Sequence, residues 1–392
     1  MLPFLIYFRQ RLKLPQFMEH RRISYYEGLD LFVNGSTEEL KRRADQLRFQ
    51  LNPKKEVTFV LDSNPNYTNV CNADCSFCAF YRKPSAKDAY TKTVEEVLKH
   101  FEIARQAGLT TVLLQGGLND ELKIEYYEEL VRAIRQRYPD IYPHLFSAPE
   151  LWNVAKVSGI TVEETLIRLW KAGLRSIPGG GAEILSEKVR SSISPKKMEP
   201  GAWIELHKTA HRLGYKTTAT MMYGHVEEPE DILLHLEALR SLQDQYKGFT
   251  AFIPWSYKRD RTALRRKVNH WVGDDAYIRI IAFSRLYLDN IPHIQASWFS
   301  EGKEIGMEAL HSGADDFGGI IFEENVHKAT GFIHKASHND VLSMIREAGF
   351  EPVQRSTMYQ VLRRYRENEF VSLPRIQVEG TNIPSQLTVI GK

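Results

Sequence analysis

Three cysteines stand close together in this sequence, and they are the only cysteines among its 392 residues. Cys71, Cys75 and Cys78 follow a C-x3-C-x2-C spacing, so one short loop carries three thiolates. Cysteine thiolates bind the irons of iron–sulfur clusters, and three of them can hold three corners of a [4Fe-4S] cube. Because no fourth cysteine exists, one iron must take its ligand from elsewhere, and such an iron is open for chemistry.

The cysteines have two alternative roles. A zinc site of this kind would need a histidine as fourth ligand, and no histidine lies between residues 20 and 100. The three thiols could also be unrelated and buried. We favour a metal cluster, because cysteines at such short spacing are typical of metal sites.

The composition excludes several classes of protein. Hydrophobic residues make up 43% and charged residues 26%, so a fibre or a wholly disordered chain is excluded. Lysine and arginine exceed aspartate and glutamate by 52 to 49, and so small a surplus predicts no nucleic-acid partner. No run of 18 apolar residues predicts a membrane span, and residues 1–17 lack the features of a secretory signal. We therefore expect a cytoplasmic protein without stable membrane insertion.

Short apolar runs alternate with amphipathic stretches of helical length. After a strand at 57–62, the predicted strands lie near 67–70, 110–115, 144–146, 176–178, 217–222, 249–253, 293–298 and 316–321. The predicted helices cover about 36–50, 93–107, 121–138, 161–172, 200–213, 229–246, 274–290, 301–312 and 335–348. Strands that alternate with helices predict an α/β fold with a parallel sheet.

About 300 residues of this alternation predict a closed (β/α)8 barrel of TIM type, and an open doubly wound sheet is the alternative. We expect an N-terminal extension of helices and a strand over residues 1–56, the barrel over 57–350 and a C-terminal tail over 351–392. Barrel enzymes carry their chemistry at the carboxyl ends of the strands. The cysteine loop follows the first strand, so it lies where such an active site is expected.

A C-x3-C-x2-C loop after the first barrel strand, with the aromatic residue Phe77 before the third cysteine, resembles the radical S-adenosylmethionine (SAM) superfamily. The resemblance implies a [4Fe-4S] cluster held by the three cysteines, with SAM on the fourth iron. It also implies reductive cleavage of SAM to methionine and a 5′-deoxyadenosyl radical. A reductant is then needed, and we expect an electron donor such as flavodoxin or ferredoxin.

The same resemblance predicts residues around SAM. Gln115, Gly116 and Gly117 end the second strand, where the superfamily has its glycine motif for the SAM amino group, and a turn is the alternative role. Ser147 ends the third strand as a hydrogen-bond donor. Glu183 follows a glycine triplet and would bind the ribose or the amino group, or else meet a helix dipole. Arg190 would pair with the carboxylate, or form a surface salt bridge.

Further segments resemble the branch that makes menaquinone and deazaflavin precursors, and within it the cyclic dehypoxanthine futalosine synthases. They are residues 66–71, 77–82, 178–185, 217–227, 248–255, 289–292, 294–298 and 352–355. The resemblance implies cyclisation of dehypoxanthine futalosine in menaquinone biosynthesis, begun by hydrogen abstraction from ribose C4′. One departure is the segment 256–261, which is more basic than expected after Ile253-Pro254-Trp255.

Four polar residues complete the predicted site. His225 and Glu227 close the fifth strand as candidates for the proton acceptor, and a satisfied polar pair at the barrel rim is the alternative. Gln295 and Ser297 alternate along the predicted strand 293–298, so they share one face and would bind sugar hydroxyls of the substrate. Rival functions are the sister aminofutalosine synthase, a deazaflavin-precursor synthase, and, outside the enzymes, an iron–sulfur electron carrier.

Overall fold

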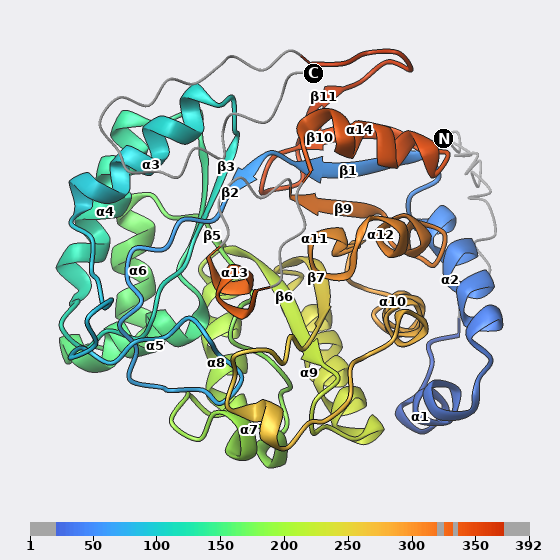
Figure 1. Cartoon of the computed structure of the whole chain (residues 1–392), viewed down its shortest axis with the longest axis horizontal. Coiled ribbons are helices and arrows are strands. Elements are labelled where there is room, and N and C mark those ends of the chain that lie inside the picture. The colour runs from blue at the N-terminus through green and yellow to red at the C-terminus, as the bar shows by residue number, and fades with distance from the viewer. Residues whose placement is uncertain (1–20, 320–324, 332–335, 372–392) are drawn as a thin grey trace, which may run out of the picture.

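A ring of parallel strands with helices outside it organises the chain (Figure 1). The computed structural model describes residues 21–319, 325–331 and 336–371. The strands of the ring are β1 (Glu56–Val60) with β2 (Asp62–Ser63), β3 (Thr111–Leu114), β4 (Tyr142–Leu145), β5 (Ser176–Ile177), β6 (Lys216–Tyr223), β7 (Phe249–Ser256), β8 (His293–Ile294) and β9 (Asp316–Gly319). Because β1 and β2 are consecutive pieces of one bent strand, the ring has the eight positions that the sequence predicts.

Parallel pairing runs around the ring in chain order. β2 pairs with β3 and β3 with β4, while β5, β6, β7 and β8 form a second continuous ladder. A bridge between Gln295 and Asp316 joins β8 to β9, and β9 pairs with β1. Between β4 and β5 the link is a 2.7 Å side-chain hydrogen bond between His144 and Ser176. The prediction of a TIM-type (β/α)8 barrel is confirmed.

Helices cover the outside of the ring (Figure 1). They are α3 (Val94–Gln106), α4 (Ile124–Arg137), α5 (Ala148–Ser158), α6 (Val162–Ala172), α7 (Glu187–Ile193), α8 (Pro200–Arg212), α9 (Pro229–Tyr246), α10 (Asp274–Tyr287), α11 (Trp298–Glu301), α12 (Lys303–Leu310) and α14 (His338–Glu347). The short helix α13 (Val326–Thr330) instead lies across the middle of the ring in the view of Figure 1. Thr93 opens α3 with the capping box that its sequence predicts. Helix α5 was not predicted, although Ser147 and Glu150 form a capping box at its start.

The N-terminal extension holds two helices, α1 (Tyr25–Asn34) and α2 (Thr37–Leu51), and α2 packs on α10. The part of it that precedes residue 21 lies outside the described residues. No helix in the described ranges is both long and apolar enough to cross a membrane.

Three predicted boundaries were wrong. Residues 67–70 form single bridges rather than a strand, because the chain there is already the loop that carries the cysteines. The strand predicted at 293–298 ends at Ile294, and Ser297 is the N-cap of α11. The barrel does not give way to a tail at residue 351, because β10 (Glu351–Arg355) pairs in parallel with β1 and β11 (Val361–Arg364) pairs with β10. The remainder of the predicted tail, 372–392, lies outside the described residues.

Candidate active site

The cysteine loop lies at the carboxyl end of the first barrel strand. Cys75 is buried, and Cys71 and Cys78 are partly buried, within a small apolar cluster that includes Phe77 and Leu118. Burial raises the pKa of the Cys75 thiol to about 12. Within the described residues, no three His, Cys, Asp or Glu side chains converge as ligands of a single metal ion. A four-iron cube takes each thiolate at a separate corner, so its three cysteines need not converge on a single point.

The glycine turn after β3 packs directly against the cysteine loop. The N–H of Asn72 donates to the Leu118 carbonyl at 3.0 Å. A Cβ atom on Gly117 would stand 2.1 Å from the carbonyl oxygen of Val70, and one on Gly116 would stand 2.7 Å from the Tyr67 ring. Both glycines are therefore required by chain packing. Their N–H groups are used within the chain, so what they can offer a ligand is their carbonyl oxygens.

A buried carboxylate, Glu150, joins three pieces of this site. It accepts hydrogen bonds from Tyr67 Oη at 2.6 Å, from the Gly116 N–H at 2.9 Å and from the Ser147 N–H at 2.7 Å. The Ser147 hydroxyl, predicted as a donor to SAM, donates to Glu150 at 2.5 Å, so towards a ligand it can act only as an acceptor. Burial raises the pKa of Glu150. Glu150 thus fixes the loop, the glycine turn and the end of β4 together.

Glu183 lies on the loop after β5, beside the cysteine loop. Its oxygens accept from Arg190 Nη1 at 3.1 Å and from Lys197 Nζ at 2.9 Å, and all three side chains are at least 87% buried. Burial alone would raise the pKa of Glu183, but the charges of Lys197 and Arg190 outweigh it and lower that pKa below its ordinary value. The residue has a positive φ of 44°, which its ion pairs hold in place.

Arg190 is buried, so the alternative of a surface salt bridge is wrong. Its guanidinium donates to the carbonyls of Gly181, Ala182 and Met198 at 2.9, 2.8 and 2.6 Å, in addition to Glu183. Only its Nε is buried without a hydrogen-bond partner. Arg190 therefore holds the glycine-triplet turn in shape, and little of its hydrogen-bonding capacity remains for a carboxylate.

His225 and Glu227 form a closed arrangement at the rim after β6. The His225 ring has no exposed surface, and its Nε2 donates to the Met222 carbonyl at 3.0 Å. Glu227 accepts from the backbone N–H groups of Gly224 and His225. Burial would raise the pKa of Glu227, but its hydrogen bond with His225 lowers it overall. These contacts match the alternative of a satisfied polar pair, and the proton-acceptor role of the two residues stays a prediction.

The two predicted substrate-binding residues are not on one face. Gln295 is half-buried between β7 and β9, where its backbone N–H donates to the Phe252 carbonyl. Ser297 is fully buried and donates to the Pro254 carbonyl at 3.1 Å, while its N–H donates to Tyr277. The chain turns into α11 here, which removes the alternation that the prediction assumed. The structure therefore leaves Gln295, but not Ser297, with a partly exposed side chain.

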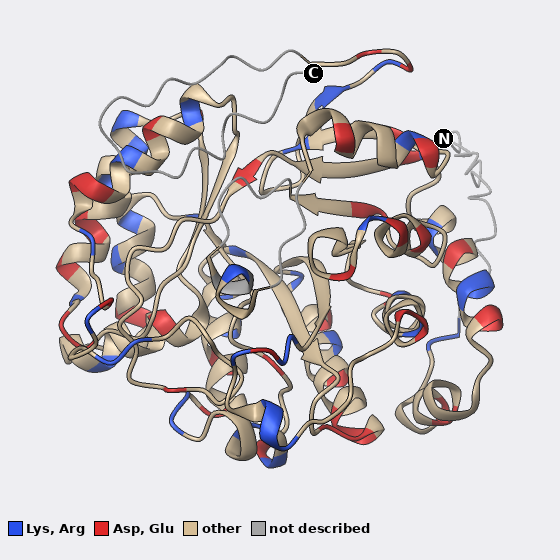
Figure 2. Cartoon of the chain, in the orientation of Figure 1, with Lys and Arg blue, Asp and Glu red and all other residues tan. Residues whose placement is uncertain are grey.

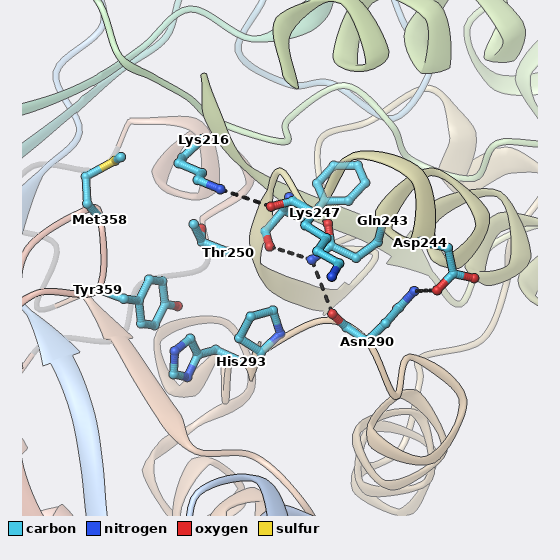
Figure 3. Close-up of a pocket in the computed structure, with 11 residues that line it drawn as sticks. Lys216, Gln243, Asp244, Lys247, Thr250, Asn290, His293, Met358 and Tyr359 are labelled. Atoms are coloured by element: carbon cyan, nitrogen blue, oxygen red, sulfur yellow. Dashed lines mark hydrogen bonds between the residues drawn. The ribbon is translucent and has the colours of Figure 1, made fainter. Parts of the chain in front are cut away.

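A cavity of about 490 Å³ lies at the opposite end of the barrel (Figure 3). It is lined by the first residues of β6, β7 and β8, among them Lys216, Thr250 and His293, and by Tyr359 from the turn between β10 and β11. Lys216 Nζ donates to the Lys247 carbonyl at 3.0 Å. Because active sites of such barrels lie at the carboxyl ends, this cavity is separate from the cysteine loop.

Comparison with known proteins agrees with this geometry. A model of the radical SAM superfamily matches residues 65–239, and a model of the CofH/MqnC C-terminal region matches residues 246–368. The cyclic dehypoxanthine futalosine synthase of Halalkalibacterium halodurans is 41% identical over 89% of this chain and 94% of that enzyme. The chain belongs to the radical SAM superfamily. The second match includes β10 and β11, which agrees with their place in the sheet.

Other relatives carry names that denote different activities. The 5-amino-6-(D-ribitylamino)uracil–L-tyrosine 4-hydroxyphenyl transferase of Methanopyrus kandleri is 42% identical over 79% of this chain and 86% of that enzyme. The aminodeoxyfutalosine synthase of Streptomyces coelicolor is 36% identical over 88% and 92%. The crystal structure of methylornithine synthase matches with a TM-score of 0.63 at 17% identity over 84% and 93%, which shows the shared fold.

Membership in the radical SAM superfamily makes this protein an enzyme that uses a [4Fe-4S] cluster and SAM, acts on a small molecule and needs a reductant. The alternative of an electron carrier is therefore dropped.

Sequence reasoning missed Lys197 and left the role of Glu150 open. Lys197 gave no signal because it comes 14 residues after Glu183, and only the fold brings its ammonium to that carboxylate, near Cys75 and 5.7 Å from the Phe77 ring centre.

Proposed function

We propose that this radical SAM enzyme converts dehypoxanthine futalosine to its cyclic product in menaquinone biosynthesis. The observation that carries the proposal is the similarity to a cyclic dehypoxanthine futalosine synthase along 94% of that enzyme, with the cysteine loop at the strand ends where barrel enzymes react. Three free thiols and an oxygen-sensitive cluster also fit a reducing, cytoplasmic setting.

We assign the cluster ligands to Cys71, Cys75 and Cys78. Cysteines must lose their protons to bind iron, and burial opposes this in the cluster-free loop. The pKa of Cys75 is raised overall by burial, and the ammonium of Lys197 opposes part of that rise and so favours the thiolate. A three-cysteine donor set would leave one iron without a protein ligand, and SAM bound there would supply a 5′-deoxyadenosyl radical.

Residues of three neighbouring strand ends surround the proposed SAM site. The carbonyl oxygens of Gly116 and Gly117 would accept hydrogen bonds from the amino group of SAM, and Gln115 lies beside Gly180 on the glycine-triplet loop. The Ser147 hydroxyl donates its proton to Glu150, so it could only accept a hydrogen bond from SAM. Phe77 forms an apolar wall next to the thiols.

The ion pairs of Glu183 with Lys197 and Arg190 provide fixed charges beside the proposed SAM site. A fixed polar environment of this kind orients a bound ligand without reorganisation of the chain.

The proposed reaction moves one hydrogen atom, one electron and one proton. The hydrogen atom would pass from ribose C4′ of the substrate to the 5′-deoxyadenosyl radical, and the resulting carbon radical would add to the aromatic ring. Loss of one electron, which the oxidised cluster would accept, and of one proton, for which His225 and Glu227 are the predicted acceptors, would restore aromaticity and give the spirocyclic product. Gln295 lies at the end of β8 with a partly exposed side chain, and we assign it to a substrate hydroxyl.

The test is anaerobic incubation of the iron-loaded enzyme with SAM, a reductant and dehypoxanthine futalosine deuterated at C4′. Mass spectrometry should find cyclic product, and the deuterium should appear in 5′-deoxyadenosine. Cys75→Ala is the control, and it should take up less iron and form neither compound. Cyclic product without deuterium transfer would overturn the C4′ assignment, and no cyclic product from an enzyme that cleaves SAM would overturn the substrate.

Two sister activities are the alternatives, because relatives with those names match at 42% and 36% identity. The same preparation should therefore be offered the substrates of the transferase and of the aminodeoxyfutalosine synthase. Product from either of these, without product from dehypoxanthine futalosine, would assign the chain to that activity instead.

A further inference from the structure

A basic segment lies on the outside of the cysteine loop, and the proposed reaction does not use it. Residues 258–267 contain six lysines or arginines and one acidic residue, Asp260. Lys258 is buried, with its Nζ 3.2 Å from Glu301. Arg265, Arg266 and Lys267 are consecutive and exposed on the 3-10 turn η1 (Leu264–Arg266) and directly after it. We call these three residues, together with Lys196, the basic rim.

The basic rim is fastened to the cysteine loop by hydrogen bonds. The Leu264 N–H donates to the carbonyl of Ser76 at 2.8 Å, and Ser76 stands between Cys75 and Cys78. Ser76 in turn donates through its N–H and its hydroxyl to the carbonyl of Ile193, the last residue of α7. Arg265 therefore follows a residue that contacts the cluster loop directly. The chain places exposed cations over the backbone that carries the thiolates.

The other side of the loop carries a further rim cation. Lys196 pairs with Asp74, a residue of the cysteine loop itself, at 2.9 Å. Lys267 Nζ reaches Ser192 at the end of α7, so η1 and α7 lie side by side, as Figure 1 shows. In Figure 2 the blue of η1 stands next to α7 at this edge of the molecule. Arg265 and Arg266 make no ion pair with any described residue, so their charges face solvent.

An exposed aromatic residue borders the basic rim. Trp271 is 53% exposed, and the guanidinium of Arg259 lies 5.7 Å from its ring centre. Arg259 also donates to the Asn269 carbonyl at 3.0 Å, which closes the segment into a loop and fixes it on the surface. Tryptophan and arginine are enriched where proteins dock, because they combine large contact area with polar contacts. The surface therefore has the chemistry of a protein interface with negative charge on the partner.

We propose that the basic rim is the docking surface for an acidic electron-transfer protein, which delivers the electron that the cluster needs. This inference rests on the proposed radical SAM chemistry, since that chemistry requires one-electron reduction of the cluster that the thiolates beneath the rim would hold. Complementary charge steers such a partner to its surface and raises the association rate by about 10- to 1000-fold at low ionic strength. A small uncharged reductant needs no docking and gains nothing from the rim.

The test compares reduction of the iron-loaded enzyme by reduced flavodoxin and by photoreduced 5-deazariboflavin, in stopped flow under argon. The triple variant Arg265→Glu, Arg266→Glu, Lys267→Glu should slow reduction by flavodoxin about 10-fold or more at low salt. The difference should shrink as salt is added, because salt screens exposed charges. Reduction by deazariboflavin should stay at the wild-type rate, which also shows that the variant is folded and loaded.

A matched control has the same change of net charge far from the loop. Lys55, Lys99 and Lys171 are exposed, before β1, on α3 and on α6, and their triple change to Glu should leave the flavodoxin rate unaltered.

An equal loss in both triple variants would overturn the proposal in favour of a net-charge effect, and wild-type rates in the rim variant would overturn it outright. Rim-dependent sedimentation with phosphatidylglycerol vesicles, with unaltered flavodoxin kinetics, would overturn it in favour of a membrane surface. If the wild-type enzyme cleaves no SAM after reduction by deazariboflavin, the proposed function fails. The docking surface is then judged separately, by the rates of cluster reduction.

Discussion

Removal of the Lys197 ammonium should show how much the buried ion pair with Glu183 contributes to the free energy of unfolding. At 2.9 Å and an effective dielectric constant of about 20, the Coulomb energy of the pair is about 6 kcal/mol before desolvation. Breaking a buried pair costs about 3–5 kcal/mol in measured cases, because one charge is left unpaired. Arg190 still contacts the other oxygen of Glu183 at 3.1 Å, so we expect Lys197→Met to lower the free energy of unfolding by about 3 kcal/mol.

A double-mutant cycle isolates this interaction. Glu183→Gln alone leaves the Lys197 ammonium unpaired, whereas the double variant Glu183→Gln, Lys197→Met removes both charges. Arg190 keeps its carbonyl acceptors Gly181, Ala182 and Met198 in every variant, so the turn should survive. Anaerobic urea unfolding of the cluster-free, reduced chains should give a coupling energy of about 2–3 kcal/mol. A coupling below about 0.5 kcal/mol would refute the reasoning from the ion pair.

The pH dependence of the same variant follows from the sign of the shift. The pKa of Glu183 is lowered in the folded protein, so its contribution is present above the unfolded pKa of about 4.3 and is lost as pH falls through the folded pKa. Without Lys197 that pKa rises, and the acid-dependent part of the stability should shrink. Urea midpoints measured from about pH 3 to about pH 6, which spans the fall through the lowered pKa of Glu183, would show a flatter curve for Lys197→Met than for the wild type.

Three further predictions concern other parts of the site. Gly117→Ala should displace the cysteine loop, because its Cβ would meet the Val70 carbonyl at 2.1 Å, and reconstituted protein should bind less iron in a colorimetric assay; full iron content with normal SAM binding would contradict this. Burial raises the pKa of Glu150, so the wild type should lose stability as the pH rises above about 4.3. Glu150→Gln should remove this loss, and urea midpoints from about pH 4 to pH 8 measure it. His225→Ala should lower the unfolding midpoint, because the hydrogen bond to the Met222 carbonyl is lost, and chromatography of cyclic product per 5′-deoxyadenosine tests its predicted role as proton acceptor: a fall in that ratio would support the role, and an unchanged ratio would exclude it.

The barrel could be predicted from the sequence because its signals are local. Capping residues such as Thr93 and Thr161 mark helix starts, and apolar runs mark strands. The end of β8 could not be predicted, because Ala296 and Ser297 continue an alternating pattern while the chain already turns into α11. β10 was missed for a different reason. Its pairing partner is β1, almost 300 residues away, and no local pattern records such a contact.

The candidate site shows the same division between local and distant causes. The cysteine spacing is a local pattern, and it led directly to the cluster. Glu150 and Lys197 act through partners 83 and 14 residues distant in the chain, at Tyr67 and Glu183, so their roles follow from the fold alone. The solvent-facing cations of residues 265–267 are visible in the sequence, but their place over the cysteine loop is not.

The pairing of β10 with β1 has a consequence for synthesis of the chain on the ribosome. Glu56 pairs with Glu351, so one edge of the first strand waits for a partner that is made 295 residues later. At about 5–20 residues per second, that interval is roughly 15–60 s. An unpaired strand edge is a template for wrong pairing between nascent chains. Chains truncated before residue 351 should therefore aggregate, and chaperones that bind nascent polypeptides should improve the yield of the complete protein.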